Sequence, residues 1–314
     1  MRSYVLRRAL TFLITIWLAA SLSFFTLLVL PGDPARLILG VDANPQALAA
    51  LERQLGLDAP ALVRYGRWLA DAARLDLGSS LVYHLPVAQL IGQRLQVTLP
   101  LAGLALALAT GLGVPLGLLA AHRRGGGLDA LVSGLAQIGL ALPSFWLGIF
   151  LILLFAVRLN WLPAGGFPGW DAGWGPALQA LLLPAAALGA ARAASLTRIV
   201  RAAALDVLGR DFVRTARAKG VPEARVLSRH VLRNALITIS TVIVLELGQL
   251  LAGAVIIEQV FSLPGLGSLA LTAVQSRDLP LTQGVVVVIA GAIVFLSFVN
   301  DLLYAYLDPR IRYA

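Results

Sequence analysis

The feature that most constrains this chain is a series of apolar runs, each about 20 residues long or more. They cover residues 9–30, 98–121, 131–157, 177–199, 237–257 and 283–303. At 1.5 Å per residue of helix, each run can cross the roughly 30 Å hydrocarbon core of a bilayer. Only 13% of the residues are charged, about half the share of a soluble domain. The sequence predicts an all-α polytopic membrane protein with six transmembrane helices.

The first run begins after Arg2, Arg7 and Arg8, as a secretory signal peptide does, and residues 18–21 resemble a cleavage site. The run nevertheless stays apolar as far as Leu30, which is longer than the core of a typical signal peptide. We therefore expect an uncleaved first span, ended by a turn at residues 31–34.

The main segment between spans, residues 35–96, predicts three short helices. The first opens at Asn44–Pro45, a capping residue followed by a first-turn proline, and closes at Gly56. The others run from about Pro60 to Leu75 and from about Pro86 to Leu95. Their apolar sides predict that they lie on the bilayer surface or on the mouth of the protein.

Residues within the runs indicate a packed bundle of helices. Gly113 and Gly117 form a small-xxx-small pattern that lets two helices approach closely. Pro143 and Pro184 fall inside two of the runs, where neighbouring helices must satisfy the carbonyl groups that proline leaves free.

The loops carry an asymmetric charge that sets the orientation. With both termini in the cytoplasm, the loops there hold 16 basic and 5 acidic residues, whereas the outer loops hold 8 of each. Topology explains this excess of positive charge, so a nucleic-acid partner is not needed. We expect residues 1–30 to form the N-terminal tail and first span, 31–96 an extracytoplasmic helical segment, and 97–314 a five-helix core.

The most strongly charged stretch of the chain, residues 201–236, is predicted to be cytoplasmic and contains two helical patterns. In the first, Leu205, Leu208, Phe212 and Ala216 share one side. Between the patterns Gly220 supplies a sharp turn.

The second pattern starts at Pro222, with Glu223 at the positive end of the helix. Its apolar side carries Val226, Leu227, Val231 and Leu232. The stretch is therefore interpreted as a helix–glycine–helix knob that binds a partner. The alternative is an ordinary basic loop that holds the topology and contacts anionic lipid.

The chain lacks the residues of a catalytic site. Lys219 is the only lysine of the chain. It is followed by Gly220 and not by the Ser or Thr that follows the lysine of a phosphate-binding loop, so ATP hydrolysis must belong to another polypeptide. His84, His122 and His230 lack metal-ligand spacing, and cysteine is absent. No nucleophile elbow is present either. We expect no catalytic residue, metal or cofactor on this chain.

Charged residues inside the predicted spans are candidates for function because they are costly to bury. Arg192 and Glu246 are expected at similar depth, so they pair with each other or Glu246 lines a path and meets a cationic group of the substrate. Alternatively, Arg192 reaches the interface and Glu246 is a structural contact. Glu258 and Asp301 lie near the ends of their spans.

Nine segments, in order, are similar to one known family over nearly the whole chain. They cover residues 30–34, 55–58, 76–79, 142–148, 161–166, 211–220, 229–236, 258–267 and 307–312. On these residues the chain resembles the B-type inner-membrane permease of ABC importers for dipeptides, oligopeptides and nickel. The resemblance implies the type I ABC importer permease fold and a bacterial inner-membrane location.

The resemblance also implies partners and a coupling site. The partners are a second, C-type permease, two ATPase subunits that bind ATP and Mg, and an extracytoplasmic solute-binding protein. Anchored on Gly220, the family's coupling motif covers positions of which this chain keeps only Ala216, Gly220 and Leu232. The residues expected to couple to the ATPase are Arg214, Thr215, Ala216, Arg217, Lys219, Gly220, Glu223, Arg225 and Leu232.

Two further expectations follow from the resemblance. The loop that carries Pro264, Gly265 and Gly267 is expected to form an extracytoplasmic gate near the site of substrate delivery. Arg192, Glu246 and Glu258 are candidates for the translocation path, although a neutral polar residue is usual at position 246, and this departure leaves the substrate class open.

Two rival functions remain for the sequence. A stand-alone secondary transporter could use Arg192 and Glu246 as an ion or proton relay, but the repeated halves of many such folds are not evident. A membrane-embedded enzyme is disfavoured because no nucleophile–base or metal constellation is present. Purification with an ATPase distinguishes the importer from the secondary transporter.

Overall fold

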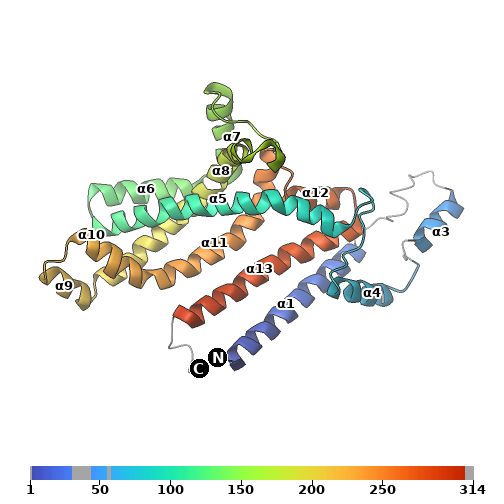
Figure 1. Ribbon diagram of the computed structural model, residues 1–314, viewed down its shortest axis with the longest axis horizontal. Coiled ribbons are helices and arrows are strands. Elements are labelled where there is room, and N and C mark those ends of the chain that lie inside the picture. The colour runs from blue at the N-terminus through green and yellow to red at the C-terminus, as the bar shows by residue number, and fades with distance from the viewer. Residues whose placement is uncertain (1, 30–43, 55–57, 308–314) are drawn as a thin grey trace. The chain divides into compact units, whose positions relative to one another are not determined.

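The computed structural model describes residues 2–29, 44–54 and 58–307 (Figure 1). In these ranges the regular structure is helical, apart from one isolated bridge between Ser79 and Pro86. The α-helices are α1 (Arg2–Val29), α3 (Pro45–Gln54), α4 (Ala61–Ala73), α5 (Val87–His122), α6 (Gly127–Ala141), α7 (Ser144–Leu151), α8 (Trp174–Leu208), α9 (Asp211–Ala218), α10 (Glu223–Arg225), α11 (Arg233–Val260), α12 (Leu266–Gln275) and α13 (Leu279–Leu307). Three other helical segments are η1 (Ile152–Arg158), η2 (Trp170–Ala172) and η3 (Val226–Leu232), of which η1 and η3 are π-helical.

Some of the sequence predictions concern residues outside these described ranges. The turn at 31–34, the end of the first short helix at Gly56 and most of the segment 307–312 lie outside the described ranges.

The contacts within the chain define two compact units. Unit 1 contains residues 97–264 together with 1–5 and 296–314, and unit 2 contains residues 6–96 and 265–295.

Unit 1 is built around α8. In its most apolar window 67% of the residues are buried, against 33% or less in the other four continuous candidate spans. Helices α6, α7 and α11 pack directly against it. Leu181, Leu188 and Ala185 are buried in one apolar cluster with residues of α5 and α11. The small side chains along α8 explain how so many helices reach it.

The predicted close approach at Gly113 and Gly117 is confirmed. A Cβ atom on Gly117 would lie 2.7 Å from the Thr197 carbonyl oxygen, and one on Gly113 would lie 3.0 Å from that of Ala193. Gly189 of α8 has the reverse role, because its Cβ would meet the Ala105 carbonyl at 2.7 Å. Glycine at these positions therefore sets the distance between α5 and α8.

The run 131–157 does not form one continuous span. It breaks between α6 and α7, whose continuation through η1 is bent by 99° from α6. Leu142 adopts an extended conformation (φ −80°, ψ 124°), as a residue before proline tends to do, and Pro143 starts the next helix without a donor to the previous turn. The described residues thus contain five continuous candidate spans, or six when the bent pair counts as one.

The prediction of a separate third helix at about 86–95 is also wrong. Val87–His122 is one helix of 36 residues, with Pro100 and Pro115 inside it. Buried residues continue at helical spacing through the expected boundary, from Leu90 to Val97 and Leu101. No turn residue interrupts this stripe, so the short helix and the second span are joined.

Unit 2 has its own apolar cluster. The start of α5 contributes Val87 and Ile91, α12 contributes Leu269 and Ala273, and α13 contributes Leu281, among others. A second contact joins α1 and α4, where Ser21 and Tyr65 lie 2.6 Å apart through their hydroxyl groups and Phe24 packs against Tyr65 and Trp68.

Candidate functional site

The candidate coupling site is a sharp corner between α9 and α10, drawn together at one end of unit 1 in Figure 1. Gly220 turns the chain there with φ +74°, a conformation that only glycine adopts without steric cost. Its N–H group donates to the Arg217 carbonyl (2.9 Å), and the Val221 N–H donates to the Ala216 carbonyl (3.2 Å). This pair of bonds is a Schellman motif, and it confirms the turn predicted at Gly220.

The first helix of the corner is shorter than the periodicity predicts. The pattern that joins Leu205, Leu208 and Phe212 is wrong, because α8 ends at Leu208 and α9 starts at Asp211. Arg210 between them is extended (φ −81°, ψ 147°). The change of direction exposes Phe212, 42% of whose surface is accessible.

The underside of the corner is buried. Val213 and Ala216 of α9, with Val226 and Val231 of η3, join one apolar cluster that includes residues of α8 and α11. Val226 and Val231 are fully buried and Leu227 and Leu232 are partly buried, as the second pattern predicts. Because η3 continues directly into α11, this base links the corner to a long helix of unit 1.

An ion pair closes the corner from outside. Arg217 donates two hydrogen bonds to Glu223, from Nη2 to Oε1 (2.6 Å) and from Nε to Oε2 (3.2 Å). His122, at the end of α5, lies 3.5 Å from the same Oε1. The hydrogen bonds from Arg217 lower the pKa of Glu223, and those to Glu223 raise the pKa of Arg217. The side chain of Arg217 is 43% exposed and that of Glu223 is 35% exposed.

The predicted coupling residues divide by exposure. Ala216 is buried and Glu223 and Leu232 are half-buried, so these three belong to the base and flank of the corner. The exposed members are Arg214, Thr215, Arg217, Lys219, Gly220 and Arg225. The corner therefore presents a mainly cationic face on a rigid apolar base.

The charged residues of the spans form two separate sites. Arg192 Nη1 lies 3.3 Å from Glu246 Oε2 and also donates to Gln249, so the predicted ion pair is present. Glu258 is completely buried, and Thr98 Oγ1 donates to it at 2.6 Å. Twelve residues of α11 separate the two glutamates, which is about 18 Å along a helix.

The segment expected to be a gate loop is divided in sequence between the two units, because Pro264 belongs to unit 1 and Gly265 and Gly267 belong to unit 2. On the side of unit 1, the Gly166 N–H donates to the Phe261 carbonyl (2.8 Å), and a Cβ on Gly165 would lie 2.5 Å from the same oxygen. On the side of unit 2, Gly265 is the N-cap of α12 and Gly267 is buried in the first turn of that helix. Pro264 is half-buried.

Sequence reasoning missed a bidentate ion pair in unit 1. Arg201 donates from Nε (2.6 Å) and Nη2 (2.7 Å) to the two oxygens of Asp129, which also accepts from the Gly125 N–H (2.9 Å). The pair ties the start of α6 to α8. The two residues are 72 positions apart, and as loop charges they gave no signal of pairing.

No group of three or more metal-ligating side chains (His, Cys, Asp or Glu) occurs among the residues that the structure describes.

Comparisons with known proteins identify the class of protein. Residues 113–313 match the family described as binding-protein-dependent transport system inner membrane component, and residues 1–102 match the N-terminal region of such components. The chain therefore belongs to this family. It is a multi-pass membrane permease of the kind found in ABC importers, which explains the series of apolar spans.

The chain is similar over its full length to curated relatives. It is 41% identical over 316 residues to a protein of Brucella abortus named as a peptide transport system permease protein, with all of both chains covered. It is 40% identical over 313 residues to the glutathione transport system permease protein of Shigella flexneri, again with full coverage of both.

A solved structure shows the fold. A chain of the MetNI methionine ABC transporter, in an inward-facing conformation, matches with a TM-score of 0.60 at 18% identity. The match covers 70% of this chain and 97% of that one. At this identity the likeness concerns the fold, and it confirms the predicted type I importer permease fold.

Proposed function

We propose that this chain is the permease subunit of an ATP-driven importer for peptides or a related small solute such as a nickel chelate. Peptide and glutathione permeases among its full-length relatives support a peptide cargo. The pair formed by Arg192 and Glu246 and the buried Glu258 are ionisable groups within predicted spans, which makes them our candidates for the translocation path.

The proposed assembly contains a second permease, two ATPase subunits and an extracytoplasmic binding protein. ATP and Mg bind to the ATPases, since the only lysine of this chain does not stand in a phosphate-binding loop. The charge of the loops favours cytoplasmic termini, which puts the α9–α10 corner on the same side as the ATPases and the loop with Pro264, Gly265 and Gly267 on the outer side.

The observation that carries the proposal is the construction of the α9–α10 corner. A short helix ends in a Schellman turn at Gly220, its apolar side is buried on α8 and α11, and its other side presents exposed cations. A groove on an ATPase can bind such a corner as one rigid body. Movement of the ATPases then acts directly on α11 through η3.

The test is purification of the tagged chain from its native membrane, followed by mass spectrometry of the proteins that accompany it. We expect an ATPase and a second permease in stoichiometric amounts. Substitution of the exposed Arg217 and Lys219 by glutamate should release the ATPase but not the second permease. A chain that purifies alone and moves solute into liposomes without ATP would contradict the proposal and favour a secondary transporter.

A further inference from the structure

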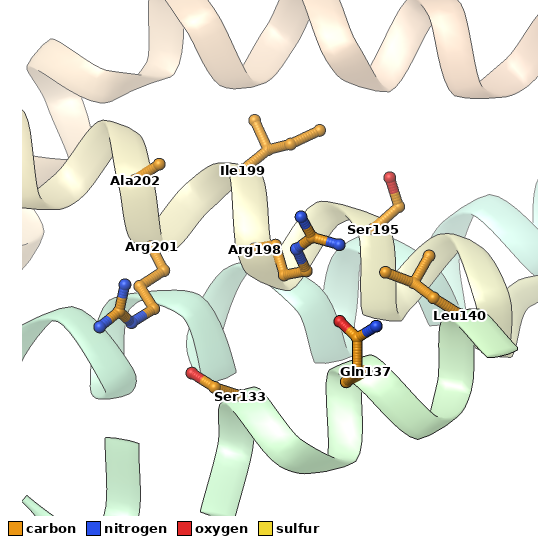
Figure 2. A pocket seen from close by; sticks show the side chains of 8 residues that line it. All are labelled: Ser133, Gln137, Leu140, Ser195, Arg198, Ile199, Arg201 and Ala202. Carbon is orange, nitrogen blue, oxygen red and sulfur yellow. The ribbon is translucent and has the colours of Figure 1, made fainter. Parts of the chain in front are cut away.

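A cavity of about 640 Å³ opens between α6 and α8 in unit 1. Figure 2 shows the side chains that line it, and the guanidinium group of Arg198 and the amide of Gln137 point into the space between the two helices. Ser133 lies one helical turn before Gln137 on α6, and Ser195 lies one turn before Arg198 on α8. Two polar faces thus meet across the cavity.

The cavity has an uncompensated positive charge. Of the three arginines on α8, Arg192 is paired with Glu246 and Arg201 is paired with Asp129. Arg198 is the third, and within residues 2–29, 44–54 and 58–307 it has no hydrogen-bond or ion-pair partner. The other polar groups of the lining are Arg201, whose charge Asp129 compensates, two serine hydroxyls and one amide, so Arg198 is the group suited to an anion.

The position of Arg198 along α8 matches the phosphate level of a bilayer. Trp174, which is 74% exposed, begins the helix, and tryptophan favours the membrane interface. The 24 residues from Trp174 to Arg198 span about 36 Å of helix, longer than a hydrocarbon core of about 30 Å and shorter than a bilayer with its headgroups. If Trp174 marks one interface, Arg198 therefore lies in the headgroup region of the opposite leaflet.

The rest of the lining distinguishes a lipid from a small anion. Leu140, Ile199 and Ala202 give the cavity an apolar part beside Arg198. A free phosphate would leave that part unmatched, whereas a phospholipid presents a phosphate to the arginine and an acyl chain to the apolar side chains. Basic pockets between transmembrane helices are typical sites for anionic headgroups.

We propose that this cavity binds an anionic phospholipid, with the phosphate on Arg198 and its acyl region along Leu140 and Ile199. The lipid comes from the leaflet on the side of the α9–α10 corner, because α8 runs from Arg198 toward that corner. The lipid would lie between α6 and α8 one turn from the Asp129–Arg201 pair. It would thus add a further link between two helices that already pack against each other.

The test measures phospholipid binding to the chain as purified with its accompanying subunits, after detergent removes native lipid. Phosphatidylglycerol and phosphatidylcholine with matched acyl chains are titrated while native mass spectrometry counts adducts. We expect phosphatidylglycerol to bind more tightly than phosphatidylcholine, and Arg198→Gln to weaken its binding about fivefold, the effect of one basic residue near an anionic surface. Arg198→Lys should retain most of the binding, and Gln137→Leu should weaken it.

A matched control is Arg124→Gln, which removes an exposed cation outside the cavity. Equal losses for Arg124→Gln and Arg198→Gln would mean general surface attraction and would overturn the proposal. Displacement of the lipid by millimolar inorganic phosphate would instead assign a free-anion site, and displacement by a dipeptide would assign a cargo site. If Arg198→Gln does not purify, retained binding in Arg198→Lys with loss in Gln137→Leu still supports the lipid site.

Discussion

The two units contain the same backbone turn, but they stabilise it in opposite ways. In unit 1, α9 ends in the Schellman motif of Gly220. In unit 2, α12 ends in another, because the Arg277 N–H donates to the Val274 carbonyl (3.2 Å) and the Asp278 N–H to the Ala273 carbonyl (2.9 Å). The residue with positive φ is a glycine in the first turn (+74°) and an arginine in the second (+52°).

The surroundings of the two turns differ as much as their residues. The α12–α13 turn is held by Asp278, which is fully buried and accepts from Ser80 Oγ (2.5 Å), the Val82 N–H (3.2 Å) and the Leu281 N–H (3.2 Å). The α9–α10 corner is held from outside by the Arg217–Glu223 pair, whose side chains are 43% and 35% exposed. The buried carboxylate of Asp278, whose hydrogen bonds are made within the protein, stabilises its turn and is not accessible to a partner. The charges at the α9–α10 corner are accessible to one.

The largest effect is expected in unit 2, from Asp278→Ala. Three donors lose their acceptor, and two of them, Ser80 Oγ and the Leu281 N–H, belong to buried residues. Each buried donor left unpaired costs about 1–3 kcal/mol, so we expect a loss of at least about 2 kcal/mol in the free energy of unfolding. It is measured as a lower midpoint of thermal unfolding in detergent. Asp71→Ala removes an exposed carboxylate of α4 in the same unit and should leave the midpoint unchanged. Equal midpoints for both variants would contradict the role of Asp278.

A smaller effect is expected from Gly220→Ala. A side chain at φ +74° costs about 1–2 kcal/mol, although no atom lies within 4 Å of the added Cβ. Gly209→Ala is the matched control, since Gly209 has φ −75° and its Cβ would make an ordinary contact of 3.6 Å. Hydrogen exchange of α9 and α10 should rise in Gly220→Ala alone. Similar exchange in both variants would mean that the turn does not need glycine.

A still smaller effect is expected from Arg217→Gln. The pair is substantially exposed, so its loss should cost no more than about 1 kcal/mol and should matter less in high salt. Hydrogen exchange at residues 217–223, at low and high salt, measures it. An effect as large as that of Asp278→Ala would remove the distinction between the two turns.

The weakest effect at neutral pH comes from titration of Glu223. Arg217 holds the pKa of this carboxylate below its ordinary value of 4.5. The pair therefore stabilises the corner fully above that value, and its contribution is lost as the pH falls through the lowered pKa. The difference in stability between wild type and Glu223→Gln should be present at pH 6 and shrink as the pH falls below the ordinary value of 4.5. A difference that grew in acid would have the wrong sign.

Much of the fold follows from the sequence, because hydrophobic length determines which segments span a membrane. The breaks are harder to predict. Pro143 was expected inside one continuous span and instead marks a 99° break, since the residue before a proline prefers an extended backbone. Conversely, the prolines at 100 and 115 leave α5 unbroken. Whether a proline kinks or ends a helix depends on the packing around it, which periodicity does not contain.

The candidate site was predictable where a single residue decides the geometry. Gly220 is such a residue. The buried side of the second helical pattern, with Val226 and Val231, was also predictable, from its periodicity. The Arg217–Glu223 pair was not predicted because the turn itself brings together two side chains six positions apart. Asp129 and Asp278 gave only a charge in a predicted loop, since their partners are 72 and 198 positions away.

The central claim is that the α9–α10 corner transmits ATPase movement to the permease, and uptake measured together with ATP hydrolysis tests it directly. The complete complex is reconstituted in liposomes with the binding protein and a dipeptide, for wild type, Gly220→Pro, Arg217→Glu and the control Gly209→Ala. We predict that Gly220→Pro and Arg217→Glu lose at least about tenfold in peptide moved per ATP hydrolysed, a change of about 1.4 kcal/mol, while Gly209→Ala resembles wild type. Unchanged coupling in both corner variants, with the ATPase still bound, would contradict the claim.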